Sequence, residues 1–193
     1  QSVGVDADFV LTDFTDKQEK KLRDSGLCRM AGISRQVACL SRRQAGELGI
    51  RGALFRYADD TCLERQVKPA FGRIAGNFPK KENEILIPQW LAEKLGISGG
   101  RMGQKVRLDI YYGGTAAKFN RLSEDLSVQF RVSGIYDDRS DNYVRNTAQI
   151  YVSKRFWKAA PYEDKKYRKA VYITLKEGAG RKELQEMLHL EES

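Results

Sequence analysis

Hydrophobic and polar residues alternate with a period of two in three segments of the chain. In the clearest of them, Val106, Leu108 and Ile110 alternate with charged residues. Such alternation is typical of a strand with one buried and one exposed face. It predicts strands at 104–111, 127–136 and 170–175. Shorter apolar runs predict further strands at 8–12, 36–40, 52–57, 84–87 and 149–153.

Four helices are predicted among these strands, at about 15–25, 60–67, 88–95 and 181–189. The first has a capping box that starts at Thr15, and it would end at Gly26. Asp60 is expected to cap the second, and Pro69 to stop it soon after Val67. Three polar segments are interpreted as connecting loops, at 41–49, 113–125 and 137–146.

The order of these elements indicates an α+β fold with an insertion. The chain opens with a β-α-β-β-α pattern, and the terminal β-α pair has no strand partner nearby in the sequence. We therefore expect both chain ends to form one lobe, residues 1–79 and 161–193. The mainly β segment 80–160 would be a second, inserted lobe. The strands near Phe9 and Ile173 should then share a sheet, and the two termini should lie on one face of the molecule.

The composition is that of a folded protein with excess positive charge. Of 193 residues, 41% are hydrophobic and 31% are charged, which excludes a disordered chain and a bundle of membrane helices. The 34 Lys and Arg residues outnumber the 26 Asp and Glu residues, which gives a net charge of +8. No apolar stretch reaches the roughly 20 residues of a membrane-spanning helix. Because the first residue is Gln and no secretory signal follows it, we expect a processed product or a piece of a longer chain.

Residues that most reaction centres need are scarce. The only histidine is His189, so catalytic triads, Cys/His zinc sites and a small hydrolase are disfavoured. The three cysteines are expected to be small buried hydrophobes, with a single bridge between Cys28 and Cys39 as the alternative. The glycine cluster at 96–103 follows a helix and precedes a strand, the reverse of the phosphate-binding order. We therefore expect no catalytic, cofactor-binding or metal-binding residues.

Positive charge occurs in short runs along the whole chain, at 20–21, 42–43, 80–81 and 165–169. We interpret these runs mainly as a solvated basic surface. A basic domain can also bind nucleic acid or an anionic polymer. No helix-turn-helix, zinc finger or aromatic RNA-binding motif accompanies the basic runs. A free basic binding domain for nucleic acid or an anionic polymer is therefore the alternative function.

Five ordered segments resemble one protein family. The segment 71–87 reads FGRIAGNFPKKENEILI; it is followed by a helix at 90–96, MGQKV at 102–106, FRVSGI at 130–135 and IYVS at 150–153. In this order and spacing they are similar to the extracytoplasmic core domain of MacB-like, FtsX-like ABC transporter permeases. The likeness covers about residues 70–153. The turn between Gly72-Arg73 and Pro79 is longer than the family pattern, and the chain ends agree only in their β-α pattern.

The resemblance implies a porter-like α+β lobe with an inserted sabre-like lobe, placed between two membrane helices on the extracytoplasmic face of the cell membrane. It implies a non-catalytic role in export, lipoprotein release or resistance to antimicrobial peptides. The implied partners are the membrane helices of the same permease, a separate cytoplasmic ATPase, a second permease copy, and an extracytoplasmic protein, peptide or lipid. No cofactor and no nucleic acid are implied.

We expect the chain to cross between the two lobes near residues 76–83 and 154–169. Four residues are candidates for the hinge between the lobes. Gly72 would permit a sharp turn into the inserted lobe, and Pro79 would stiffen the end of the crossing. Glu84 begins the first inserted strand. Arg73 is expected to pair with a carboxylate such as Glu84 and so to fix the angle between the lobes.

Overall fold

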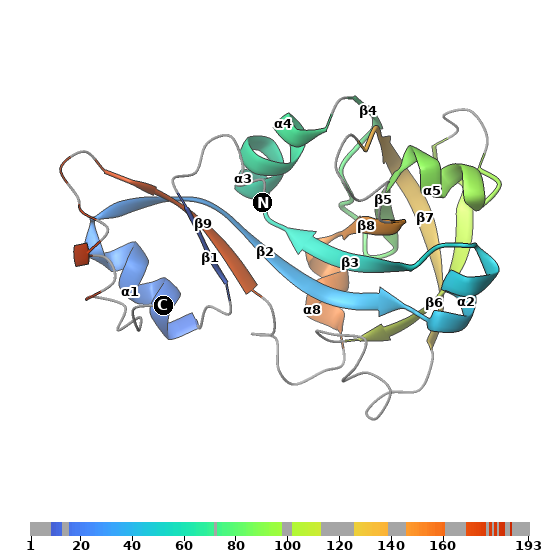
Figure 1. The fold of residues 1–193 in the computed structure, drawn as a ribbon, viewed down its shortest axis with the longest axis horizontal. Coiled ribbons are helices and arrows are strands. Elements are labelled where there is room, and N and C mark those ends of the chain that lie inside the picture. Colours follow the sequence, from blue (N-terminus) through green and yellow to red (C-terminus); the bar gives the residue numbers. More distant parts are fainter. Residues whose placement is uncertain are drawn as a thin grey trace.

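The computed structural model describes residues 9–12, 16–71, 73–97, 102–112, 126–138, 146–160, 169–176, 178, 180, 182–183 and 186. Its strands are β1 (Phe9–Thr12), β2 (Cys28–Leu40), β3 (Gly52–Ala58), β4 (Ile74–Gly76), β5 (Glu84–Pro88), β6 (Lys105–Tyr112), β7 (Leu126–Tyr136), β8 (Thr147–Val152) and β9 (Lys169–Leu175) (Figure 1). Its helices are α1 (Asp16–Ser25), α2 (Arg42–Glu47), α3 (Asp60–Cys62), α4 (Lys68–Ala70), α5 (Gln89–Lys94) and α8 (Lys154–Ala159), with a π-helical turn, η1 (Leu63–Val67), between α3 and α4. This content confirms the α+β fold class.

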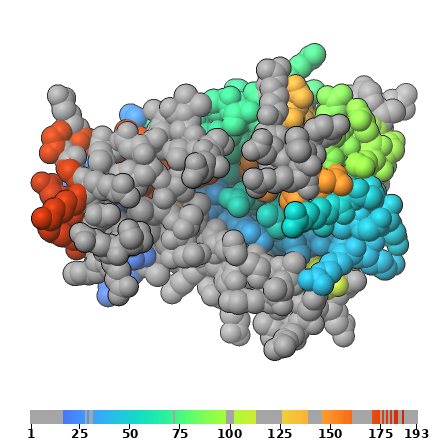
Figure 2. Space-filling view, viewed as in Figure 1, coloured from blue at the N-terminus to red at the C-terminus, as the bar shows by residue number. Residues whose placement is uncertain are grey.

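Six of the strands close into a barrel. Around it the order is β2-β3-β8-β5-β7-β6, and β6 pairs with β2 to complete the ring. β3 and β8 are parallel, as are β5 and β7, and the remaining neighbours in the ring are antiparallel. In the space-filling view, α2 and β3 (blue to cyan) and α5 (light green) lie close together at one end of the molecule (Figure 2).

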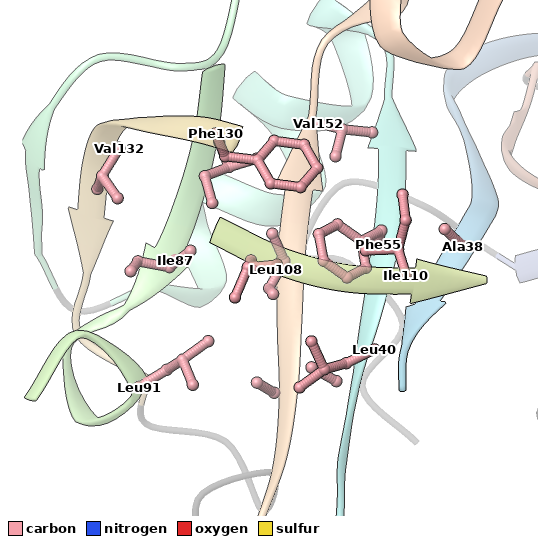
Figure 3. Close-up of a cluster of buried hydrophobic side chains, with 14 of the residues drawn as sticks. Ala38, Leu40, Phe55, Ile87, Leu91, Leu108, Ile110, Phe130, Val132 and Val152 are labelled. Atoms are coloured by element: carbon pink, nitrogen blue, oxygen red, sulfur yellow. The ribbon is translucent and has the colours of Figure 1, made fainter. Parts of the chain in front are cut away.

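The barrel interior is the main hydrophobic core, as expected for a small closed barrel. All six strands contribute inward side chains, among them Leu40, Phe55, Ile87, Leu108, Phe130 and Val152 (Figure 3). The ring of Phe130 stacks on that of Phe55 with centroids 5.5 Å apart, and its centroid lies 5.4 Å from that of Phe156 in α8. Trp90 and Leu91 of α5 are buried in the same cluster. The strands predicted at 104–111 and 127–136 are thus confirmed. Burial alternates along β6 and along β7 up to Val132, whereas β7 is buried at every position from Val132 to Tyr136.

A three-stranded antiparallel sheet extends from one side of the barrel. β2 belongs to both units, because its first residues pair with β9 and its last residues, 38–40, pair with β6. β1 pairs with β9 on the far side, with Phe9 opposite Ile173. The prediction that the opening and closing strands share a sheet is confirmed. α1 contacts β2, and its Leu22 is fully buried.

Strands from both predicted lobes close the one barrel. β2 and β3, from residues 1–79, pair with β6 and β8, from residues 80–160. The core likewise contains Phe55 from the first lobe and Phe130 from the second. The boundaries expected at 79/80 and 160/161 therefore pass through the barrel, and independent movement of the two lobes stays a prediction. The visible change of architecture lies along β2, between the barrel and the three-stranded sheet.

The helical segment after β3 differs from its prediction in two ways. Its cap is Asp59, whose Oδ1 accepts the Cys62 amide at 2.8 Å, so the prediction of Asp60 as cap is wrong by one residue. The segment also passes Pro69 and ends at Ala70. The π turn η1 precedes Pro69 and shifts the backbone hydrogen bonds there, which lets the helical path continue past the proline.

The sequence pattern missed four features of the fold. α2 and α8 lie in segments interpreted as connections, and each begins after a serine cap, Ser41 or Ser153. Each of these six-residue helices buries one residue, Ala45 or Phe156, so no apolar periodicity marks them. β4 was not predicted, and β2 starts at Cys28 rather than at residue 36. The additional length of β2 buries Ser34 and Arg35, which hides the strand from a hydrophobic pattern.

Several predicted features lie outside the described residues: Gly72, the cap at Thr15, the loop 113–125, most of the loop 137–146, most of the helix 181–189 with His189, and both termini. Within the described residues, no helix has the length and apolar character that crossing a membrane requires.

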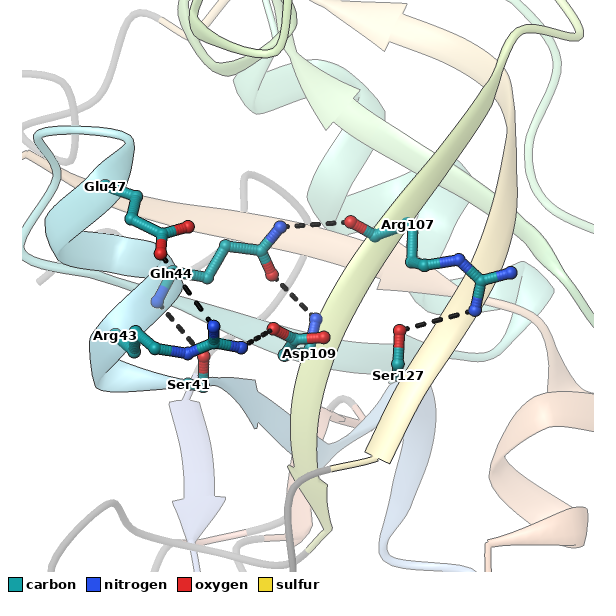
Figure 4. A network of polar contacts seen from close by, with 7 residues as sticks. All are labelled: Ser41, Arg43, Gln44, Glu47, Arg107, Asp109 and Ser127. Atoms are coloured by element: carbon teal, nitrogen blue, oxygen red, sulfur yellow. Dashed lines mark hydrogen bonds and ion pairs between the residues drawn. The ribbon is translucent and has the colours of Figure 1, made fainter.

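The side chain of Gln44 extends the β2–β6 ladder at the point where β2 ends. Its Nε2 donates to the carbonyl oxygen of Arg107 at 3.0 Å, and its Oε1 accepts from the Asp109 amide at 2.6 Å (Figure 4). One amide side chain therefore satisfies two backbone groups at the edge of β6. Arg43 adds an ion pair to the Asp109 carboxylate at 2.7 Å.

Gln44→Ala is expected to lower the free energy of unfolding by about 1–3 kcal/mol, because both backbone groups lose their partner. Urea unfolding followed by circular dichroism measures the change. Arg43→Ala removes the ion pairs that this largely exposed side chain makes with Asp109 and Glu47. It is the matched control, with an expected loss below about 1 kcal/mol. Equal losses in the two variants would contradict the role given to Gln44.

Candidate functional site

Cysteine chemistry is disfavoured in the described residues. Cys39 and Cys62 are buried free thiols. The alternative of a Cys28–Cys39 bridge is wrong, because the two residues lie 39 − 28 = 11 positions apart along the one strand β2. An extended strand of that length spans about 35 Å, and a disulfide joins Cα atoms about 7 Å apart at most. No group of three Asp, Glu, His or Cys within the described ranges is arranged to hold a metal ion.

Burial keeps three ionisable groups in their neutral form. It raises the pKa of Cys39 to about 11 and that of Cys62 to about 12. It also raises the pKa of Tyr57 to about 12, with a further contribution from the nearby Asp59 carboxylate. The two thiols are therefore protonated at neutral pH and are poor nucleophiles.

Stability is expected to fall as the pH rises above about 9. In the unfolded chain these groups lose their protons near the ordinary values of 9.0 for Cys and 10.0 for Tyr, but in the folded protein they hold them to about pH 11–12. Between these limits the folded state binds more protons, so the free energy of unfolding decreases with pH. Urea midpoints measured from pH 7 to about 10.5 check this. A midpoint that stays constant or rises over that range would show that the three groups are not shielded as described.

Two adjoining hollows form a groove at the carboxyl ends of β3 and β8. Their volumes are about 750 and 340 Å³, and Tyr57, Asp59, Lys154 and Lys158 line both. Because β3 and β8 are parallel, the chain leaves both strands at the same edge of the barrel. α3 follows β3 and α8 follows β8, so the first residues of both helices border the groove. We call it the β3–β8 groove.

An aromatic stack forms one wall of the groove. The rings of Tyr57 and Trp157 are nearly parallel, with an interplanar angle of 5° and centroids 5.0 Å apart. Arg35 lies opposite Tyr57 in the β2–β3 ladder, and its guanidinium carbon is 4.9 Å from the centroid of the Trp157 ring. A guanidinium over an indole face is a favourable cation–π contact. These contacts fix α8 against the barrel.

Positive side chains outnumber carboxylates around the groove. The cations are Arg23, Arg35, Lys80, Lys154, Arg155 and Lys158, and the carboxylates are Glu19, Asp59 and Asp60. Six charges against three give the groove a net charge of +3. Two of the carboxylates are already engaged: Glu19 pairs with Arg23 at 2.9 Å, and Asp59 accepts the amides of Ile33 and Cys62. The arrangement favours an anionic ligand over catalysis.

The groove also touches both structural units. Glu19 and Arg23 come from α1, beside the three-stranded sheet, whereas Trp157 and Lys158 come from α8, at the barrel. A ligand in the smaller hollow would therefore contact both units at once.

The predicted pair of Arg73 and Glu84 does not form. In the strand pairing with β7, Glu84 lies opposite Arg131, whereas the carbonyl oxygen of Arg73 accepts from the Asp137 amide. Positions 131 and 137 are six residues apart along one extended chain, about 20 Å. The Glu84 carboxylate instead accepts the amides of residues 80 and 81 at 3.1 and 2.7 Å, and so closes the turn before β5.

The other hinge candidates lie apart from one another. Pro79 is buried and borders the β3–β8 groove beside Lys80. Arg73 is exposed and borders a separate hollow of about 360 Å³, with Gln89 and Asp137. A hinge role for these residues stays a prediction.

The glycine of the FRVSGI segment marks a crowded meeting of three strands. β4 and β5 both pair with β7 at this point. A side chain on Gly134 would come within 2.6 Å of the Asn77 carbonyl oxygen and 2.8 Å of Leu86 Cδ1. A residue without Cβ is therefore required for the close approach of the strands.

Sequence reasoning did not single out the residues of the β3–β8 groove. They come from segments distant in the sequence, and no motif joins Tyr57 to Trp157. One signal was available: Lys154, Arg155 and Lys158 have the spacing of one helix face. No apolar periodicity accompanies this spacing, because α8 buries only Phe156.

No protein-family model matches the chain, and no curated protein shows a significant match to it. Among solved structures, the periplasmic region of MacB from Actinobacillus actinomycetemcomitans is similar in fold, with a TM-score of 0.47 and 7% identity over 92% of this chain and 72% of that chain. A domain assigned to a permease protein from Porphyromonas gingivalis gives a TM-score of 0.38 and 13% identity over 94% of this chain and 67% of that one.

Proposed function

We propose that this chain is the extracytoplasmic domain of an ABC transporter permease. The observation that carries the proposal is that the first and last strands of the chain are neighbours. β1 and β9 are antiparallel neighbours with Phe9 opposite Ile173, so the start of β1 lies beside the end of β9. A domain inserted between two membrane helices needs its two chain connections close together.

The ordered segments of the family resemblance support the same proposal. The end of the first segment, 84–87, lies in β5. The helix segment 90–96 covers most of α5 and the residues just after it, and the segment 102–106 leads into β6. FRVSGI lies in β7 with its glycine at the strand crossing, and residues 150–152 end β8. Each segment therefore forms the type of element that the resemblance implies.

The role proposed for the domain is mechanical coupling. Movement of membrane helices would reach β1 and β9 first, because these are the first and last strands of the chain and lie side by side. β2 would pass the movement on, since it pairs with β9 at one end and belongs to the barrel at the other. The driving energy would come from a cytoplasmic ATPase, and a second permease copy would complete the transporter. Export, lipoprotein release and resistance to antimicrobial peptides are the transport types to test.

Purification of the full-length protein from its host tests this function. We expect an affinity-tagged full-length protein in the membrane fraction, and ATP hydrolysis by the detergent-solubilised preparation that vanadate inhibits. An unrelated tagged membrane protein from the same host is the control for contaminating ATPases. Recovery of the full-length protein in the soluble fraction, without ATP hydrolysis above the control, would favour the free basic binding domain instead.

A further inference from the structure

We propose that the β3–β8 groove binds a phosphate-bearing ligand, whose oxygens are held by Lys154 and Lys158 of α8 and by Lys80 on the facing turn. This inference goes beyond the proposed function, because it concerns a ligand of the groove and holds wherever the domain lies.

α8 gathers three cations on one face. Lys154 and Lys158 are four residues apart and Arg155 and Lys158 are three apart, so their side chains are neighbours on the helix surface. Like charges at these spacings destabilise a helix, and α8 has no acidic residue in its first turn to offset them. Local sequence choices that work against the fold are expected at functional surfaces. A bound anion would remove this repulsion.

A fourth cation faces α8 from a distant segment of the chain. Lys80 borders the larger hollow together with Lys154 and Arg155. Its backbone is held in place, because the Lys80 amide donates to the Glu84 carboxylate at 3.1 Å. Among the described residues, Lys80, Lys154 and Arg155 form no ion pair. These charged groups are therefore available to a ligand.

The chemistry of the cations favours phosphate. A phosphate group presents oxygens in several directions and carries more than one charge or partial charge, so ammonium groups from opposite walls can each meet one oxygen. Three ammonium groups (Lys80, Lys154 and Lys158) and the Arg155 guanidinium line the larger hollow, so a group with several oxygens can meet more of these cations than a lone carboxylate can. The larger hollow, about 750 Å³, is in the range of small-molecule sites. Tyr57 lines both hollows and Trp157 lines the smaller one, so aromatic side chains lie beside the cations.

Titration of the 193-residue chain with tripolyphosphate, followed by calorimetry, tests the proposal. Lys154→Gln/Lys158→Gln is expected to weaken binding about tenfold, because two charge contacts are lost. Lys94→Gln/Lys105→Gln removes the same charge from exposed positions on α5 and β6 and should change affinity less than about twofold. Thermal melting checks that both double variants are folded.

A second arm distinguishes a lipid headgroup from a free phosphate compound. Vesicles of phosphatidylglycerol with phosphatidylcholine are sedimented with wild type and with both double variants. If the groove variant alone loses affinity for vesicles but not for tripolyphosphate, the ligand is a lipid headgroup. If the groove variant alone loses affinity for tripolyphosphate, the ligand is a free phosphate compound. Either result supports the proposal. The proposal would be overturned if the two double variants lost the same affinity. It would also be overturned if wild type bound neither probe at millimolar concentration and low salt.

Discussion

Gly32→Ala is expected to lower the free energy of unfolding by about 3–5 kcal/mol. Two costs combine at this position. The backbone φ of Gly32 is +139°, a conformation that residues with a side chain rarely adopt. An added Cβ would also stand 2.5 Å from both the Cα and the Cβ of Cys62, so that β2 or α3 would have to move. Urea unfolding measures the loss.

Gly26→Ala is the matched control for Gly32→Ala. Gly26 also has a positive φ, +69°, but an added Cβ would meet no atom within 4 Å. We expect Gly26→Ala to lower the free energy of unfolding by about 1–2 kcal/mol, which is the cost of the positive φ alone. If Gly32→Ala and Gly26→Ala lowered the free energy of unfolding equally, the close contact between β2 and α3 would not explain why position 32 is a glycine.

The position of Gly32 links its stability effect to the proposed function. It lies in β2 where the register with β9 shifts, between the three-stranded sheet and the barrel. The neighbouring Ile33 exchanges hydrogen bonds with Asp59: its amide donates to the carboxylate, and its carbonyl oxygen accepts from the Asp59 amide. This contact fixes the sheet to the barrel, so a variant that loosens it should also weaken coupling in a transporter.

Phe130→Ala is expected to lower the free energy of unfolding by about 3–5 kcal/mol, because it leaves a cavity in the barrel core. Phe130 is 1% exposed, and its ring contacts those of Phe55 and Phe156. Denaturant unfolding with fluorescence or circular dichroism as the signal measures the change.

Phe130→Leu keeps most of the buried volume and is the control for Phe130→Ala. Its expected loss is about 1–1.5 kcal/mol, since only the ring stacking and a small volume are removed. A loss in Phe130→Ala no larger than in Phe130→Leu would mean that Phe130 is not packed at the centre of the barrel.

The strands that the sequence predicted best are those with one face in the barrel. Leu108 and Ile110 of β6 and Phe130 and Val132 of β7 are buried at alternate positions, so their period of two was readable directly. α5 was also predicted, because it follows Pro88 and buries an apolar face. In these elements the local pattern and the tertiary contacts agree.

Barrel closure was not predictable from the same pattern. Alternation tells which side of a strand is buried, but not which strand lies beside it. The closing contact pairs Ala38 with Tyr112, from opposite predicted lobes. The predicted Arg73–Glu84 pair is wrong for the same reason, because strand pairing places the two residues beside different parts of β7.

The candidate site was the least predictable feature of the molecule. The β3–β8 groove exists only because parallel pairing brings the end of β3 to the end of β8. Tyr57 and Trp157, which stack there, are 100 residues apart in the sequence. The spacing of the cations in α8 was the one local signal of this site. It indicates a binding site only together with Lys80, which lies across the larger hollow from α8.

The side of the membrane on which this domain lies is the most direct test of the proposed function. Glu93→Cys, in the full-length protein, places a thiol on the exposed face of α5. Wild type, with Cys39 and Cys62 buried, measures the background. With a membrane-impermeant maleimide and intact cells freed of any outer envelope, we expect Glu93→Cys to be labelled well above wild type. Labelling of Glu93→Cys only after the cytoplasmic membrane is permeabilised would contradict an extracytoplasmic permease domain.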